Sequence, residues 1–141
     1  FELEIAAFDR PDPAVGGEIQ VVNAPNYDRM VYPVRPLAGQ TLDVVVHVIY
    51  GHGTEGLLQV WLNGELYHWE RGSTVYDDYS FGGNNKWGIY HHTFNNSPAD
   101  VQSSIEAGIE SVEILMGNLK MLTRSPGDFE YATNAYELVK P

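Results

Sequence analysis

The chain has 141 residues, enough for one domain with a hydrophobic core. Nineteen Asp and Glu against eight Lys and Arg give a formal net charge of −11, which makes nucleic acid a poor partner. The absence of cysteine excludes disulfides, thiolate metal ligands and cysteine nucleophiles, and no apolar run approaches the roughly 20 residues of a membrane-spanning helix. The chain begins at Phe1, so we expect a processed protein or a piece of a longer one.

The first part of the chain predicts short strands separated by turns. Nine Tyr, five Phe and three Trp accompany 14 Gly and 8 Pro, a mixture typical of turn-rich β proteins. We expect strands over residues 1–8, 18–22 and 30–34. Residues 10–17 contain Pro and Gly that break regular structure, and they predict a loop.

An apolar run at 42–50 predicts the clearest buried strand. A helix is the alternative, but the β-branched content and the flanking Gly39 and Gly51 favour a strand. Alternation predicts one wholly apolar face, made of Leu42, Val44, Val46, Val48 and Tyr50.

Residues 57–69 predict a hairpin. Asn63-Gly64 between two apolar runs favours a two-residue type I′ turn, which needs positive φ at both positions. That turn predicts a register with Gln59 opposite His68. One face of the hairpin then resembles a polar groove with one large aromatic, and it holds Gln59, Trp61, Leu66 and His68. The other face is expected to be core, and it holds Leu58, Val60, Leu62, Tyr67 and Trp69.

Residues 70–85 form a polar segment that predicts a surface loop. Asp77-Asp78 with Gly82-Gly83 suggests a calcium site, although the EF-hand spacing is missing and a solvated loop is the alternative. We predict no other metal and no organic cofactor.

Residues 85–92 predict a strand that carries reactive groups on one face. Alternation places Lys86, Gly88, Tyr90 and His92 on the same side. A cation and a phenol beside a glycine floor can cradle an anionic sugar. The alternative is a half-exposed strand with a polar outer face.

The last part of the chain gives weaker signals. A loop at 93–100, a helix at 101–108, and strands at 112–116 and 119–122 are expected, and residues from 125 onwards lack clear periodicity. The number of strands predicts an all-β protein, a single β-sandwich domain over residues 1–141.

The order of these segments carries a resemblance. The apolar strand and a Gly-rich loop precede Gly-Leu-Leu-Gln-Val-Trp-Leu-Asn-Gly-Glu-Leu (56–66), a polar loop and Lys-Trp-Gly-Ile-Tyr (86–90). Over roughly residues 37–122 this order resembles the jelly-roll polysaccharide lyases of the heparin lyase I and glucuronan lyase kind. In those enzymes a strand ending in Asn-Gly or Asp-Gly precedes a Lys-x-Gly-x-Tyr strand. The resemblance implies a jelly-roll (concanavalin-like) sandwich and a secreted lyase that cleaves a uronic-acid polymer by β-elimination.

The resemblance also implies roles for residues. Tyr90 is implied as proton acceptor and donor, and Lys86 as a substrate-binding residue. A phenol with pKa near 10 is a weak base at neutral pH, and a nearby cation favours its phenolate. Lys86 is about 13 Å from Tyr90 along a strand and His92 about 6.6 Å, so His92 is the better candidate for tuning Tyr90. The expected substrate-binding residues are Lys86, Gln59, Trp61, His68 and Asn85.

This chain departs from the family in its first half. Those lyases also use a Gln and a His from strands well upstream of the hairpin, and we find no upstream match for them. Gln59 and His68 are candidates to replace that pair. The alternative is that both residues have structural roles. We therefore expect the C-terminal portion of a larger lyase, with an incomplete sandwich, or a reduced relative that only binds.

Two other functions stay open. One is a non-catalytic carbohydrate-binding or extracellular structural module on the same fold. The other is an assembly subunit in which a partner chain or self-association completes the sandwich. The expected partner is an acidic polysaccharide, which the net charge of −11 repels at long range unless Lys and Arg cluster locally.

Overall fold

The structure is a computed structural model that describes residues 2–6, 18–23, 28–32, 40–77, 98–108, 111, 113 and 115–141. The chain divides into two compact units. The first comprises Phe1–Gly83 and Met121–Pro141, and the second comprises Asn84–Lys120. None of the helices in these described ranges has the length and apolar character needed to cross a bilayer.

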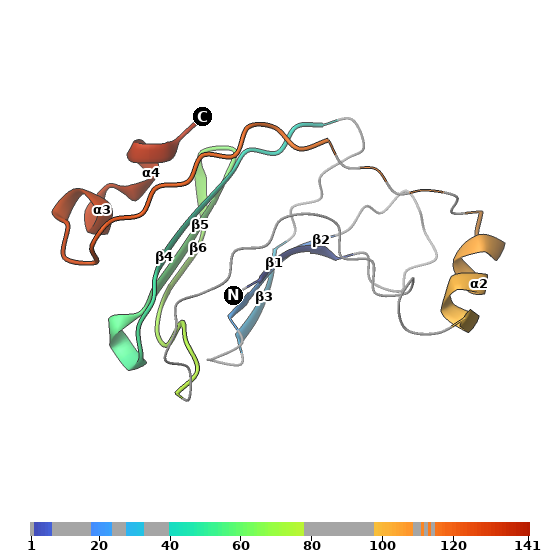
Figure 1. Ribbon diagram of the computed structural model, residues 1–141, viewed down its shortest axis with the longest axis horizontal. Helices are drawn as coiled ribbons and strands as arrows, with labels where there is room; N and C mark the ends of the chain where they lie inside the picture. The colour runs from blue at the N-terminus through green and yellow to red at the C-terminus, as the bar shows by residue number, and fades with distance from the viewer. Residues whose placement is uncertain are drawn as a thin grey trace. The chain divides into compact units, whose positions relative to one another are not determined.

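The first unit contains two antiparallel sheets of three strands each, labelled in Figure 1. In both sheets each strand pairs with the next one along the chain. One sheet consists of β1 (Glu2–Ala6), β2 (Glu18–Asn23) and β3 (Asp28–Tyr32). The other consists of β4 (Val44–Ile49), β5 (Leu57–Leu62) and β6 (Glu65–Arg71). The described chain is therefore mostly β, and each of the six strands overlaps a predicted strand, although β3 begins before the predicted start at residue 30.

The turn between β5 and β6 has the predicted two residues. Asn63 has φ 50° and Gly64 has φ 85°, so both occupy the left-handed region that a type I′ turn requires. Asn63 also ties the turn to the segment before β4. Its Oδ1 accepts a hydrogen bond from the Asp43 amide at 2.9 Å, and its own amide donates to the Asp43 carbonyl at 2.8 Å.

The pairing register of this hairpin changes after the two residue pairs next to the turn. Leu62 lies opposite Glu65 and Trp61 opposite Leu66, as predicted. Beyond that point Val60 lies opposite His68, so Tyr67 is the extra residue of a β-bulge. One extra residue moves every later side chain to the other face of the sheet. The predicted pairs Val60–Tyr67, Gln59–His68 and Leu58–Trp69 are therefore wrong.

Side chains of both sheets contribute to one hydrophobic core. Its fully buried members are Val21 of β2 and Leu58, Val60 and Leu62 of β5. Leu42, Val46, Val48 and Tyr67 pack against them. Tyr67 lies on the core side in the predicted register as well, and the bulge adds His68 to the same side.

The predicted apolar face of β4 is only partly in the core. Val44 and Tyr50 are exposed, whereas Val45 and Ile49 of the opposite face are buried. Both faces of β4 are covered because a C-terminal segment, absent from the sequence prediction, packs on the second one.

The helices differ most from expectation. α2 (Pro98–Glu106), in the second unit, begins three residues before the predicted helix and takes the end of the predicted loop 93–100. α3 (Phe129–Thr133) and α4 (Ala135–Val139) occupy the tail that lacked periodicity. Asp128 caps α3 by accepting a hydrogen bond from the Tyr131 amide at 3.0 Å.

The late predicted strands are not formed in the described residues. Residues 119–122, and the described residues of 112–116, lie in no strand. Their apolar residues are largely exposed, Leu115, Met116 and Leu119 among them. An apolar alternation becomes a strand only beside a pairing neighbour, and the described part of the chain provides none here.

Candidate functional site

The bulge at Tyr67 separates residues that the sequence predicts to lie together. Paired residues of antiparallel strands share a face, so His68 lies with Val60 on the core side of the β4–β6 sheet. Gln59 and Trp61 lie on the opposite side. We call this second side the tail face, because the C-terminal segment packs on it. No single groove can contain both Gln59 and His68. The predicted pairing of these two residues is therefore wrong, and the bulge is the reason.

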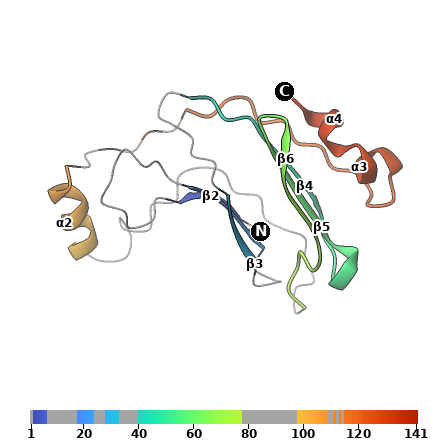
Figure 2. The ribbon, with the colours of Figure 1, turned by 180° about the vertical axis from the view of Figure 1, so that it is seen from behind.

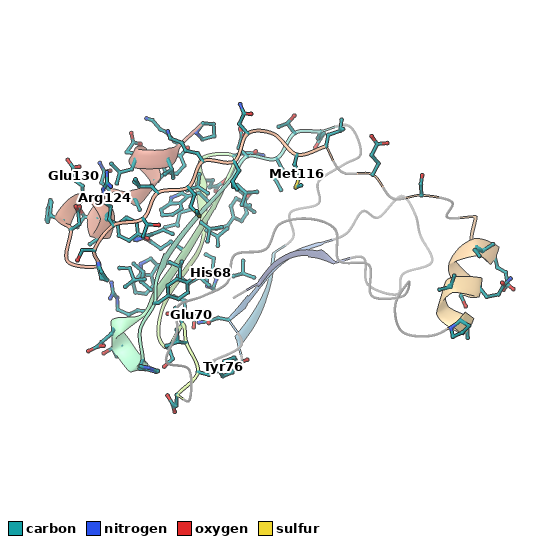
Figure 3. All side chains as sticks on the ribbon, viewed as in Figure 1. His68, Glu70, Tyr76, Met116, Arg124 and Glu130 are labelled. Carbon is teal, nitrogen blue, oxygen red and sulfur yellow. The ribbon has the colours of Figure 1, made fainter. Side chains whose placement is uncertain are left out.

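On the core side, Glu70 connects the two sheets. Its Oε2 lies 3.3 Å from His68 Nε2, and its Oε1 accepts a hydrogen bond of 2.8 Å from Asn23 Nδ2 (Figure 3 labels His68 and Glu70 on β6). Asn23 Nδ2 also donates to the Ser73 carbonyl at 3.1 Å. Asn23 is 1% exposed. A carboxylate bonded to a histidine and an amide in this position holds β6 to β2, which favours a structural role for His68.

On the tail face, His47 and Gln59 form the central polar pair. His47 Nδ1 lies 2.8 Å from Gln59 Oε1, and the two residues are directly opposite each other on β4 and β5. Because an amide oxygen only accepts, Nδ1 carries the proton and Nε2 is left as an acceptor. Nε2 is buried and finds no hydrogen-bond partner in the part of the chain that the structure describes.

The surroundings of His47 favour its neutral form. Burial lowers the pKa of His47, the hydrogen bond to Gln59 opposes this, and the positive charge of Arg71 lowers the pKa further. A neutral imidazole in this position can accept a proton or a hydroxyl hydrogen bond at Nε2.

Two tyrosines of the C-terminal segment pack on the tail face, one against His47 and one against Trp61. The Tyr131 ring meets the His47 ring edge-on, with centroids 4.6 Å apart, and its hydroxyl donates to the Val48 carbonyl at 3.1 Å. The Tyr136 ring lies 5.5 Å from the Trp61 ring at a tilt of 35°. Figures 1 and 2 both show α3 and α4 beside β4. Burial, together with the neighbouring Tyr50, raises the pKa of Tyr131, so this phenol stays protonated at neutral pH.

The β6 side of the tail face remains open. Trp69 lies opposite Gln59 and is 57% exposed, and Leu66 lies opposite Trp61 and is 47% exposed. Arg71, opposite Leu57, is exposed on the same face. The tail face therefore combines covered polar groups with an open aromatic edge.

Four of the predicted site residues cannot be compared with this geometry. Lys86, Tyr90, His92 and Asn85 lie outside the described residues, so their roles stay predictions. Calcium is one interpretation of the loop that contains Asp77-Asp78 and Gly82-Gly83, and a solvated loop is the favoured one. Of these residues only Asp77 is described, and its Oδ1 lies 3.5 Å from His52 Nδ1. Within the described ranges, no group of three or more His, Asp or Glu side chains could hold a metal ion.

His47, Tyr131 and Tyr136 were not predicted as site residues. For His47 a signal existed, because a histidine interrupts an otherwise apolar strand. The sequence gives no such signal for Tyr131 and Tyr136, because only tertiary packing brings the C-terminal segment to the sheet. No family model, no curated protein and no solved structure matches this chain.

Proposed function

We propose that this chain is part of a secreted polysaccharide lyase-like protein, with a jelly-roll β-sandwich, that acts on a uronic-acid polymer by β-elimination. One observation carries the proposal. The hairpin with its Asn63-Gly64 turn precedes Lys86-Trp87-Gly88-Ile89-Tyr90 in the order that those lyases use. The strand β4 before the hairpin also lies where that order requires it.

The proposed reaction removes the proton at C5 of the uronic acid and expels the oxygen at C4. The Tyr90 phenolate accepts the C5 proton, and the electrons of the C5–H bond form a C4–C5 double bond as the C4–O bond breaks. The leaving oxygen then takes the proton back from Tyr90. Lys86 holds the carboxylate, Asn85 contacts the substrate, and His92 assists Tyr90. His68 has no part in this step, because it is 5% exposed and bonded to Glu70.

Lyase activity is tested by the absorbance of the unsaturated uronic product on glucuronan, alginate and heparin, with and without calcium. Tyr90→Phe should abolish this absorbance, because it removes the group that transfers the proton. Tyr76→Phe is the matched control, since Tyr76 is an exposed tyrosine of the 70–85 segment. An inactive wild type on all three polymers, or a fully active Tyr90→Phe variant, contradicts this mechanism.

A non-catalytic sugar-binding module is the second candidate, and the open edge of the tail face favours it. An exposed indole beside an exposed guanidinium, Trp69 with Arg71, suits a pyranose ring that carries a carboxylate. This function would be identified if the protein binds oligoglucuronate and forms no unsaturated product. Trp69→Ala should then lose the binding and Tyr76→Ala should keep it.

A further inference from the structure

The C-terminal segment 129–139 packs on the tail face through short helices. The contacts that connect it to the sheet include the edge-on stack of Tyr131 on His47, the hydroxyl bond to the Val48 carbonyl, and the stack of Tyr136 on Trp61. Only Ala135 is buried among the residues of α3 and α4, and Phe129 is 79% exposed. Helices of five residues are far too short to be stable without packing. This segment is therefore suited to local opening.

The face below this segment is largely apolar, with Val45, Ile49 and Leu57 buried on it, but it contains one polar pair. The pair of His47 and Gln59 lies at its centre, and His47 Nε2 is an acceptor that finds no donor among the described residues. A buried acceptor without a hydrogen bond costs stability. A hydroxyl-rich ligand would supply the missing donor, which an aromatic ring cannot.

We infer that residues 129–139 are a removable cover over a sugar-binding face formed by His47, Gln59, Trp61 and Trp69. The ligand is a uronic-acid oligosaccharide. Its ring displaces Tyr136 from Trp61 and stacks there, a hydroxyl donates to His47 Nε2, and its carboxylate faces Arg71. Tyr131 and Tyr136 occupy, in the absence of ligand, the positions that sugar rings take when it binds. The inference rests on the sugar binding proposed above.

Hydrogen exchange on the whole chain tests the cover without any variant. Ala132, Asn134 and Lys140 donate their amides within the segment, to the carbonyls of Asp128, Glu130 and Tyr136. We expect these three amides to exchange faster than those of β5, and to exchange faster still when oligoglucuronate is added. Exchange as slow as that of β5, or slowing of the three amides by a bound oligosaccharide, overturns the cover.

Variants of the two tyrosines test the same idea through affinity. If the open state is about 10% populated, Tyr136→Ala should tighten apparent oligoglucuronate binding by up to tenfold, because the closed fraction no longer reduces the affinity. Tyr131→Phe, which removes only the bond to the Val48 carbonyl, should tighten it by a smaller factor and keeps the test available if Tyr136→Ala does not fold. Phe129→Ala, in the same segment and mostly exposed, is the matched control and should not change binding. Folded variants that bind no tighter than wild type overturn the inference.

The failures of the two proposals differ. If oligoglucuronate binds through Trp69 and the tyrosine variants leave its affinity unchanged, the cover is wrong and sugar binding stands. If the segment opens locally but neither wild type nor the variants bind any of the three uronic-acid polymers, the proposed sugar-binding function is overturned and the sugar-binding face with it.

Discussion

His47 and Gln59 face each other across β4 and β5, with His47 Nδ1 2.8 Å from Gln59 Oε1. This bond sets the protonated nitrogen of the histidine and uses the amide oxygen of the glutamine. The hairpin pattern alone suggests that Gln59 pairs with His68. The structure instead pairs Gln59 with His47, a residue of the neighbouring strand β4. The pair makes the tail face testable by stability as well as by ligand binding.

The first prediction concerns this pair. Gln59→Leu should destabilise the protein by about 1–3 kcal/mol, because it leaves the buried Nδ1–H of His47 without an acceptor. Urea unfolding at pH 8 measures the change. Gln102→Leu is the control, since Gln102 makes an exposed bond to Glu106 within α2 and its loss should stay within about 0.5 kcal/mol. Equal effects of the two substitutions would contradict a buried role for Gln59.

The second prediction concerns pH. The pKa of His47 is lowered in the folded protein, mainly by burial, whereas in the unfolded chain it is about 6.5. The unfolded state therefore takes up the proton at a higher pH than the folded state does. The contribution of His47 to the free energy of unfolding is complete above about pH 6.5 and is lost as the pH falls below that value toward the folded pKa.

His47→Leu should remove this contribution and flatten the dependence of unfolding free energy on pH below about 6.5. His52→Leu retains His47, and the exposed His52 makes it a suitable control. A pH dependence that is the same in wild type and in His47→Leu would show that the neutral state of His47 does not matter to stability.

The third prediction concerns the turn. Gly64 has φ 85°, a conformation that a β-branched residue rarely adopts, so Gly64→Val should cost about 1–3 kcal/mol. A side chain there would also approach the Tyr136 hydroxyl, since a Cβ would lie 3.1 Å from it. Thermal unfolding is the measurement. Gly117→Ala, where an added Cβ meets open space, should leave the melting temperature almost unchanged.

The fourth prediction concerns the connection between the sheets. Asn23→Ala removes the amide that donates to Glu70 and should destabilise the protein by about 1.5–3 kcal/mol, the range for hydrogen bonds to charged groups. Asn118→Ala, at an exposed position, is the control. If both variants unfold at the same urea concentration, Glu70 does not hold β6 to β2 through Asn23.

Local chemistry alone determined the strands and the turn of the hairpin. Asn63-Gly64 is one of the few dipeptides that accept positive φ twice, and the apolar runs on both sides of it need a sheet. The positions of β1 to β6 follow from the same local patterns. Each of these elements is specified by residues within a few positions of one another.

Tertiary structure decided which face each side chain of β6 uses. A period of two is compatible with either face. Tyr67 lies on the core side in the predicted register and in the observed one, whereas the bulge turns His68 inward and Trp69 outward. The two five-residue helices of the tail depend in the same way on a sheet distant in the sequence, because their own hydrogen bonds do not offset the entropy of ordering them. The site therefore differs from its sequence prediction at side chains whose positions are set by contacts between distant segments and not by local preferences.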